Sequence, residues 1–192
     1  MTHVDLPEPP VNPPVYKCLS YTWGDLHLTY YILVNGRVLR VRRNLYEFLE
    51  MRSECCDTTT AAERLWINAL CINQEDIVEK GHQLQRMGII YQNVAEVLIW
   101  LGNNVKVKHS SSWLGSDLGY SFLSHQTGWI DPFQEQAYDT NCVRKDLEDF
   151  CGHPYWTRAW ITQEIIFQAN IKLVFGREFI PWTYFGLALA VR

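Results

Sequence analysis

Three side chains near the end of the chain have types and a spacing that can do chemistry. Trp156, Trp160 and Glu164 are each four residues apart, so a helix predicted over Tyr155–Gln168 places two indoles and a carboxylate along one stripe. A carboxylate stabilises a developing positive charge, and indoles offer flat faces to rings. The alternative is that the Trp pair packs inward and Glu164 is solvated, as most helical glutamates are. Arg158 could pair with neighbours of Glu164 or stack on an indole, but an exposed arginine at a helix start is more often an ordinary surface residue.

Other polar side chains follow the predicted strands. The strand Tyr16–Tyr21 runs into Thr22-Trp23-Gly24-Asp25, and the apolar run Arg64–Ile72 stops at Asn73-Gln74-Glu75-Asp76. In doubly wound sheets, ligands bind outside the carboxyl ends of the strands. The candidate site is therefore built from loops 21–25, 73–76 and 102–104. Helix capping alone also explains Asn73 and Asp76.

The strands that position these loops are short, apolar and followed by turns. They are Tyr16–Tyr21, Arg64–Ile72, Ala95–Leu101 and Ile171–Phe175. Because the middle two read as buried on both faces, they predict a mostly parallel central sheet flanked by helices. Arg64–Ile72 is expected inside this sheet, neither at its edge nor helical.

Further elements surround this sheet. Asn35-Gly36 lies between two runs rich in β-formers and predicts a hairpin over Tyr30–Val41, added at one edge. Asn44 and Glu47 resemble a capping box that starts a short helix. A second helix is predicted from apolar residues at helical spacing, and Gly81 and Gly88 near the same face suggest close approach of another element. The apolar residues are Leu84, Met87, Tyr91 and Val94.

The remaining segments are harder to assign. Residues 1–15 form a Pro-rich arm, and Asn103–Asp131 is interpreted as a partly helical insertion. Val143–Cys151 predicts a short amphipathic helix, and Trp182–Val191 predicts a final one. Because the chain ends inside that apolar helix, we expect 16–192 to be one domain of a longer protein.

Composition excludes several functional classes. The 192 residues carry a formal net charge of -4, which argues against nucleic acid as a partner. The sequence has neither an apolar stretch long enough to span a bilayer nor a secretory signal, so a cytoplasmic location is expected. The six cysteines lack zinc-site spacing, and we expect no metal. No Gly-rich phosphate motif supports a Rossmann or P-loop enzyme. The spacing permits a nucleophilic pair of Cys71 with His82 or His153, but nothing local favours it.

Three segments together resemble the fungal heterokaryon-incompatibility (HET) domain. They are KCLSYTWGD at 17–25, LWINALCINQEDIVEKGHQLQRMGIIYQNVAEVLIWLG at 65–102 and YWTRAWITQEI at 155–165. The resemblance covers nearly the whole chain after the arm. This family usually has Asp at the position of Asn68, so a role that needs an acid there stays open.

HET domains are in turn similar to Toll/interleukin-1 receptor (TIR) domains, which have a flavodoxin-like sheet and serve innate immunity. The resemblance implies a role in nonself-triggered programmed cell death, with self-association and an upstream nonself-recognition or NLR-type partner. It also implies that the domain at 16–192 is the N-terminal part of a longer protein. Many TIR domains cleave NAD at the nicotinamide–ribose bond with a helical glutamate, and Glu164 stands in the matching place. NAD is thus a candidate substrate, with no cofactor implied.

The chemistry of such a reaction is compatible with these residues. Nicotinamide leaves as a neutral ring while positive charge develops on the ribose, so one carboxylate at Glu164 can suffice. The substrate-binding candidates are Ser20, Tyr21, Trp23, Gly24, Asp25, Asn68, Asn73, Trp156 and Trp160. Two classes stay open: an NAD glycohydrolase active on clustering, and a non-catalytic module whose strand-end loops contact other subunits.

Overall fold

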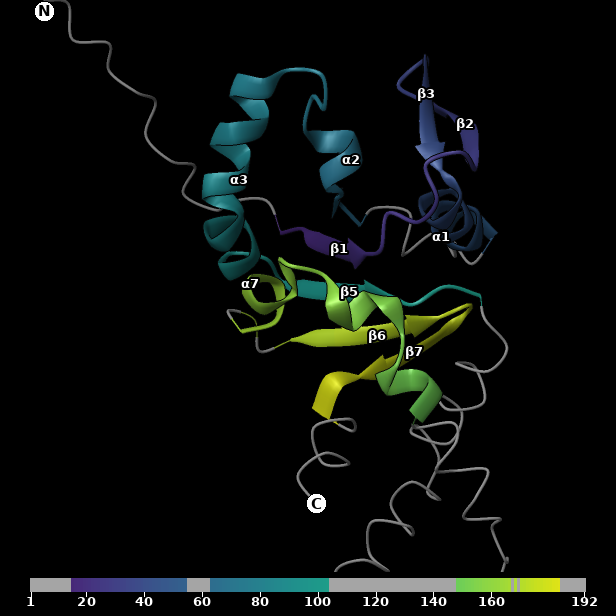
Figure 1. The fold of residues 1–192 in the computed structure, drawn as a ribbon, viewed down its shortest axis with the longest axis vertical. Coiled ribbons are helices and arrows are strands. Elements are labelled where there is room, and N and C mark those ends of the chain that lie inside the picture. The colour runs from purple at the N-terminus through teal and green to yellow at the C-terminus, as the bar shows by residue number, and fades with distance from the viewer. Residues whose placement is uncertain (1–14, 55–62, 104–147, 167, 169, 184–192) are drawn as a thin grey trace, which may run out of the picture.

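The computed structural model describes residues 15–54, 63–103, 148–166, 168 and 170–183, and its centre is a five-stranded sheet (Figure 1). The strands are β1 (Lys17–Tyr21), β4 (Leu65–Trp66), β5 (Glu96–Trp100), β6 (Ile171–Phe175) and β7 (Glu178–Pro181). They lie in the order β4-β1-β5-β6-β7. The first four strands of that order are parallel, and β7 returns antiparallel to β6. The predicted mostly parallel central sheet is confirmed.

The strand order also fixes where a ligand site is expected. Numbered along the chain, the five strands follow the sequence 2-1-3-4-5, which is a common order of doubly wound sheets. Growth of the sheet changes direction between β1 and β5, and the crevice outside the carboxyl ends of those two strands is the usual binding place. The antiparallel β7 departs from a fully parallel arrangement.

The prediction for Arg64–Ile72 is wrong. Only Leu65–Trp66 pairs as a strand, and β4 lies at the edge of the sheet. The chain turns at the extended residue Ile67 into the short helix α2 (Asn68–Cys71). A continuous apolar run does not distinguish a buried strand from a buried helical segment, and here Ala69 and Leu70 reach the core from a helix.

Helices cover both faces of the sheet. On one face, α3 (Ile77–Gln92), the 3-10 helix η1 (Pro154–Thr157) and α7 (Ile161–Ile166) contribute to a core with alternate strand residues such as Cys18 and Ile99. On the other face, α1 (Arg43–Glu54) packs on the intervening residues, among them Leu19 and Trp100. Figure 1 shows α3 and α1 on either side of β1. Within the described ranges, no helix is long and apolar enough to cross a membrane.

The hairpin is confirmed, but its place differs from the expectation. Strands β2 (Thr29–Val34) and β3 (Arg37–Arg42) pair through a turn in which Asn35 and Gly36 both have positive φ, 51° and 77°. They form a separate two-stranded sheet instead of extending the main one. Tyr30 stacks on Tyr46 of α1 with ring centroids 4.5 Å apart, so contact with a helix positions the hairpin.

The two long helices form where the sequence predicts them, with different local details. Helix α3 begins after Asp76, whose carboxylate accepts the amides of Val78 and Glu79. A Cβ added at Gly81 would meet nothing within 4 Å, so the close approach proposed for Gly81 is wrong. Helix α1 begins at Arg43, and the Asn44 side chain does not cap it, as described below.

Other predictions fall partly outside the described residues. Residues 148–151 are helical, which is the described part of the helix predicted at 143–151. The arm up to residue 14, the insertion from 104 onward and residues 184–192 of the final helix lie outside the described residues.

Candidate functional site

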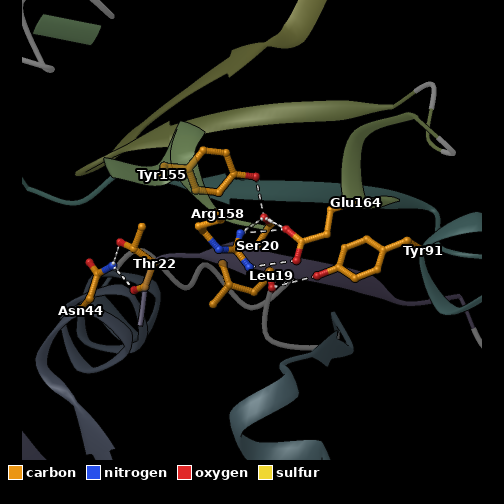
Figure 2. A network of polar contacts seen from close by, with 8 residues as sticks. All are labelled: Leu19, Ser20, Thr22, Asn44, Tyr91, Tyr155, Arg158 and Glu164. Carbon is orange, nitrogen blue, oxygen red and sulfur yellow. Dashed lines mark hydrogen bonds and ion pairs between the residues drawn. The ribbon is translucent and has the colours of Figure 1, made fainter. Parts of the chain in front are cut away.

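Glu164 lies on α7 with its carboxylate against the end of β1. The side chain is 1% exposed, and each of its oxygens accepts a hydrogen bond. Arg158 holds it in a two-pronged ion pair: Nη1 donates to Oε2 and Nη2 to Oε1, both at 2.8 Å. The Ser20 hydroxyl donates to Oε2 as well. Figure 2 shows these groups converging on one point.

Two tyrosines complete this network (Figure 2). The Tyr155 hydroxyl lies 2.5 Å from Ser20 Oγ, and Tyr91 donates to the carbonyl of Leu19 at 3.5 Å. Burial, reinforced by the negative charge of Glu164, raises the pKa of both Tyr155 and Tyr91. Both phenols therefore stay protonated at neutral pH and act as neutral hydrogen-bonding groups around a charged pair.

Arg158 is the partner that makes a buried carboxylate tolerable. Its side chain is 16% exposed, and its guanidinium lies 5.2 Å above the ring of Tyr155. Burial lowers the pKa of Arg158, but the carboxylate of Glu164 outweighs that effect and raises it. Arg158 therefore stays charged, and its two-pronged hydrogen bonding to the carboxylate is strong and directional.

A pocket of about 430 Å³ opens beside this pair, outside the carboxyl ends of β1 and β4. The expected loops 21–25 and 73–76 contribute to its lining, whereas the described residues of loop 102–104 after β5 do not. Its size is at the lower end of ordinary small-molecule sites. Helix α3 supplies an apolar wall through Leu84 and Met87. The polar and aromatic lining comes from Trp23, Asn68, Gln74, Lys80 and Trp160, besides the ion pair itself. We call this cavity the Glu164 pocket.

The structure does not form the predicted stripe of Trp156, Trp160 and Glu164. The helix predicted over 155–168 is broken, because η1 ends at Arg158, which is extended, and α7 starts only at Ile161. His153 precedes Pro154 and caps η1 by accepting the Tyr155 amide at 3.1 Å. This break turns Arg158 onto the carboxylate.

The two indoles consequently separate. The Trp156 ring packs on Phe150, its Nε1 donates to the Phe150 carbonyl at 2.6 Å, and it lines a different, apolar pocket with Cys151. Trp160 is 43% exposed and lines the Glu164 pocket. Trp160 thus retains a place at the candidate site, and Trp156 does not.

Among the candidates at the end of β1 and in the loop after it, some lie at the site and others serve only the fold. Ser20 contacts Glu164 and Trp23 lines the pocket, whereas Tyr21 is buried in the core under α1. Gly24 has a φ of 72°, and its carbonyl accepts from an arginine of β3. Asp25 accepts the amide of a residue two positions on, which makes it a turn residue outside the pocket lining.

Asn44 of α1 fastens this loop to the next strand. Its Nδ2 donates to the carbonyl and the hydroxyl of Thr22, at 2.6 and 2.9 Å (Figure 2). Its Oδ1 accepts from Trp100 Nε1 at 2.9 Å. The side chain therefore links the ends of β1 and β5. The capping interpretation of Asn44 is wrong for this reason.

Of the candidates Asn68 and Asn73, only Asn68, at the start of α2, lies at the site. Asn68 lines the Glu164 pocket, and its Oδ1 is buried without a hydrogen-bond partner among the described residues. Asn73 is exposed, accepts the Glu75 amide at 3.1 Å and does not line the pocket. Gln74 does line it and donates to the Asn68 carbonyl.

The sequence patterns do not single out two residues of this arrangement, Tyr155 and Lys80. For Arg158 they favour a surface position over pairing or stacking, whereas the structure pairs it with Glu164 and places it over the ring of Tyr155. A useful signal exists for Arg158, because a glutamate buried in a sheet protein needs a nearby cation. Among the described ranges, no three His, Cys, Asp or Glu side chains gather in a way that holds a metal ion.

Fold and site together define a doubly wound α/β domain with a charged pair and a pocket at the carboxyl ends of its parallel strands. The model of the family described as Heterokaryon incompatibility protein (HET) matches residues 16–164, and the chain belongs to this family. The predicted resemblance is confirmed.

A curated relative agrees with this assignment. The chain is 33% identical over 124 residues to "Heterokaryon incompatibility protein 6, OR allele" of Neurospora crassa. The alignment covers 58% of this chain and 18% of that protein, so the chain spans less than a fifth of the relative's length. No solved structure matches the chain.

Proposed function

We propose that this chain is a cell-death effector domain of fungal heterokaryon incompatibility that hydrolyses NAD at the nicotinamide–ribose bond when it is clustered. Membership of the HET family and the name of the Neurospora relative support the biological process. The observation that carries the chemical part is the position of Glu164, a carboxylate that lines a small-molecule-sized pocket beside the carboxyl ends of β1 and β4. The TIR-like character of the fold is part of this proposal.

The proposed reaction needs little machinery. Water adds to the anomeric carbon, the glycosidic C–N bond breaks with its electron pair going to nicotinamide, and the products are nicotinamide, ADP-ribose and a proton. Positive charge develops on the ribose in the transition state, and a carboxylate beside it is stabilising. Trp23 and Trp160 lie in the same pocket and offer ring faces to the aromatic parts of the substrate.

The ion pair gives a physical reason for latency. In the present arrangement, Arg158 and Ser20 occupy both oxygens of Glu164. The carboxylate can act on a ribose only when Arg158 releases at least one of them. Release of this kind is a conformational step, and association of several domains is a way to favour the released state.

The test is to incubate the purified chain with NAD at rising protein concentration and to quantify free nicotinamide by chromatography. We expect specific activity to increase with protein concentration, because mass action populates the assembled state. A molecular crowder is expected to shift that increase to lower concentration. Specific activity that stays flat over a wide range contradicts clustering, and no nicotinamide release under any of these conditions contradicts the enzymatic proposal.

A second function is favoured by a different observation. The outward face of the hairpin carries Tyr31, Leu33 and Val38, all strongly exposed, with Leu33 directly opposite Val38. Exposed apolar patches often mark protein-interaction surfaces. A non-catalytic module for self-association or for an upstream nonself-recognition partner would use such a face, with the Arg158–Glu164 pair serving only the fold. The chain with Leu33→Ser and Val38→Ser should then lose toxicity in cells. The double variant Arg158→Met/Glu164→Leu, which lacks the carboxylate but replaces the whole pair by apolar groups, should keep it.

A further inference from the structure

The charges that line the Glu164 pocket do not cancel. The lining holds one carboxylate, Glu164, and two cations, Arg158 and Lys80. Arg158 is engaged with both oxygens of Glu164. Lys80 makes no ion pair with any residue that the structure describes. One positive charge in the pocket is therefore left for a ligand.

The place of Lys80 suits an anion at the pocket. It lies in the first turns of α3 and is exposed, with Leu84 one helical turn further along the same face of the helix. Leu84 and Lys80 both line the cavity, so the methylene stem can lie along the apolar wall while the ammonium group stays in water. A lysine in this setting binds phosphate as a compact point charge with three donors.

We propose that Lys80 binds a phosphate group of the ligand, so that the Glu164 pocket selects phosphorylated nucleotides over the corresponding nucleosides; this rests on the proposed function for the nicotinamide part of the ligand. Selection arises because the phosphate provides the anionic partner for Lys80 that the described residues do not provide. NAD, with its pyrophosphate, belongs to the favoured class, and nicotinamide riboside does not.

The test compares two probes that differ by one phosphate, nicotinamide mononucleotide and nicotinamide riboside. Binding to the whole chain is followed by calorimetry or by tryptophan fluorescence, since Trp23 and Trp160 line the cavity. The variants are Lys80→Gln, Lys80→Arg and the control Arg86→Gln, an exposed cation of the same helix outside the pocket lining. Because Lys80 is exposed, its substitution is expected to leave the fold intact.

We expect the wild type to bind the mononucleotide at least 10-fold more tightly than the riboside, in a salt-dependent manner. Lys80→Gln should remove most of this difference by weakening the mononucleotide alone. Lys80→Arg should retain it, and Arg86→Gln should match the wild type. An unchanged preference in Lys80→Gln, or equal weakening of both probes, overturns the inference.

The outcomes also separate this inference from the proposed function. If the phosphate preference depends on Lys80 but NAD is never cleaved, the phosphate site stands and the glycohydrolase proposal fails. If NAD is cleaved with the same KM by wild type and Lys80→Gln, the glycohydrolase proposal stands and the phosphate assignment fails.

Discussion

Removing the charge of Glu164 is expected to destabilise the fold strongly. The side chain is 1% exposed and its partner Arg158 only 16% exposed, so Glu164→Gln leaves a mostly buried guanidinium without a counter-ion. Breaking a buried pair in this way typically costs about 3–5 kcal/mol, and the remaining exposure of Arg158 places the expected loss near the lower figure. The same loss is expected for Arg158→Gln, which isolates the carboxylate.

The double variant Arg158→Met/Glu164→Leu is the matched test of this reasoning. Replacing a buried pair by apolar groups of similar volume is often neutral or stabilising, so we expect the double variant within about 1 kcal/mol of the wild type. Ser20 Oγ and the Tyr155 hydroxyl remain as each other's partners, as they are at 2.5 Å now. The two single losses should therefore be far from additive.

Urea denaturation followed by circular dichroism measures these effects. With a slope of about 2 kcal/mol/M, a loss of about 3 kcal/mol lowers the midpoint by about 1.5 M. A midpoint shift below about 0.5 M for Glu164→Gln would refute the claim that the pair is buried and coupled. A double variant as unstable as the sum of the single variants would refute the same claim.

Three further predictions concern the surroundings of the pocket. Burial lowers the pKa of His153 from 6.5, so the unfolded chain binds more protons than the folded chain just below that pH, and the free energy of unfolding should fall as the pH drops through this window. His153→Asn can still accept the Tyr155 amide but does not titrate there, so it should reduce this pH dependence in urea denaturation at several pH values. Asn44→Ala removes three side-chain hydrogen bonds and should cost about 1–3 kcal/mol in urea denaturation, with Asn44→Asp recovering part of the loss. Gly81→Ala in the helix interior should stabilise the protein by about 0.5–1 kcal/mol, whereas Gly24→Ala, at a φ of 72°, should destabilise it. Changes of the two melting temperatures in the same direction would contradict the assigned backbone conformations.

Local signals in the sequence predicted much of the fold. Asn35-Gly36 specifies its turn through two positive φ values, and the alternation along Lys17–Tyr21 matches a strand with a core on each face. The apolar run 64–72 failed as a strand because burial alone does not select between strand and helix. Its helical half became α2, which carries Asn68 to the pocket.

The candidate site was predicted in part for similar reasons. The rule that ligands bind at the carboxyl ends of parallel strands pointed to the loop after β1, and Ser20 does contact Glu164. The prediction of one continuous helix over 155–168 is wrong, because the His153 cap and Pro154 start a 3-10 helix that ends just before the extended residue Arg158. The spacing of residues in the sequence reveals neither this break nor the ion pair between Arg158 and Glu164 that depends on it.

A comparison of two buried glutamates tests directly whether Glu164 acts on NAD. Glu96, at the amino end of β5, is 4% exposed and pairs with Lys17 and Lys172, so Glu96→Gln is a control of similar burial and chemistry at the far end of the sheet. The measurement is the rate of nicotinamide release per folded molecule, with the folded fraction taken from circular dichroism in the same buffer.

We expect Glu164→Gln to lower this rate by about 10²–10³-fold, the usual effect of losing one well-placed electrostatic stabiliser. Glu96→Gln should keep the rate within a few-fold of the wild type. If the wild type releases nicotinamide and folded Glu164→Gln releases it at the same rate, Glu164 is a structural partner of Arg158 and the catalytic account is contradicted.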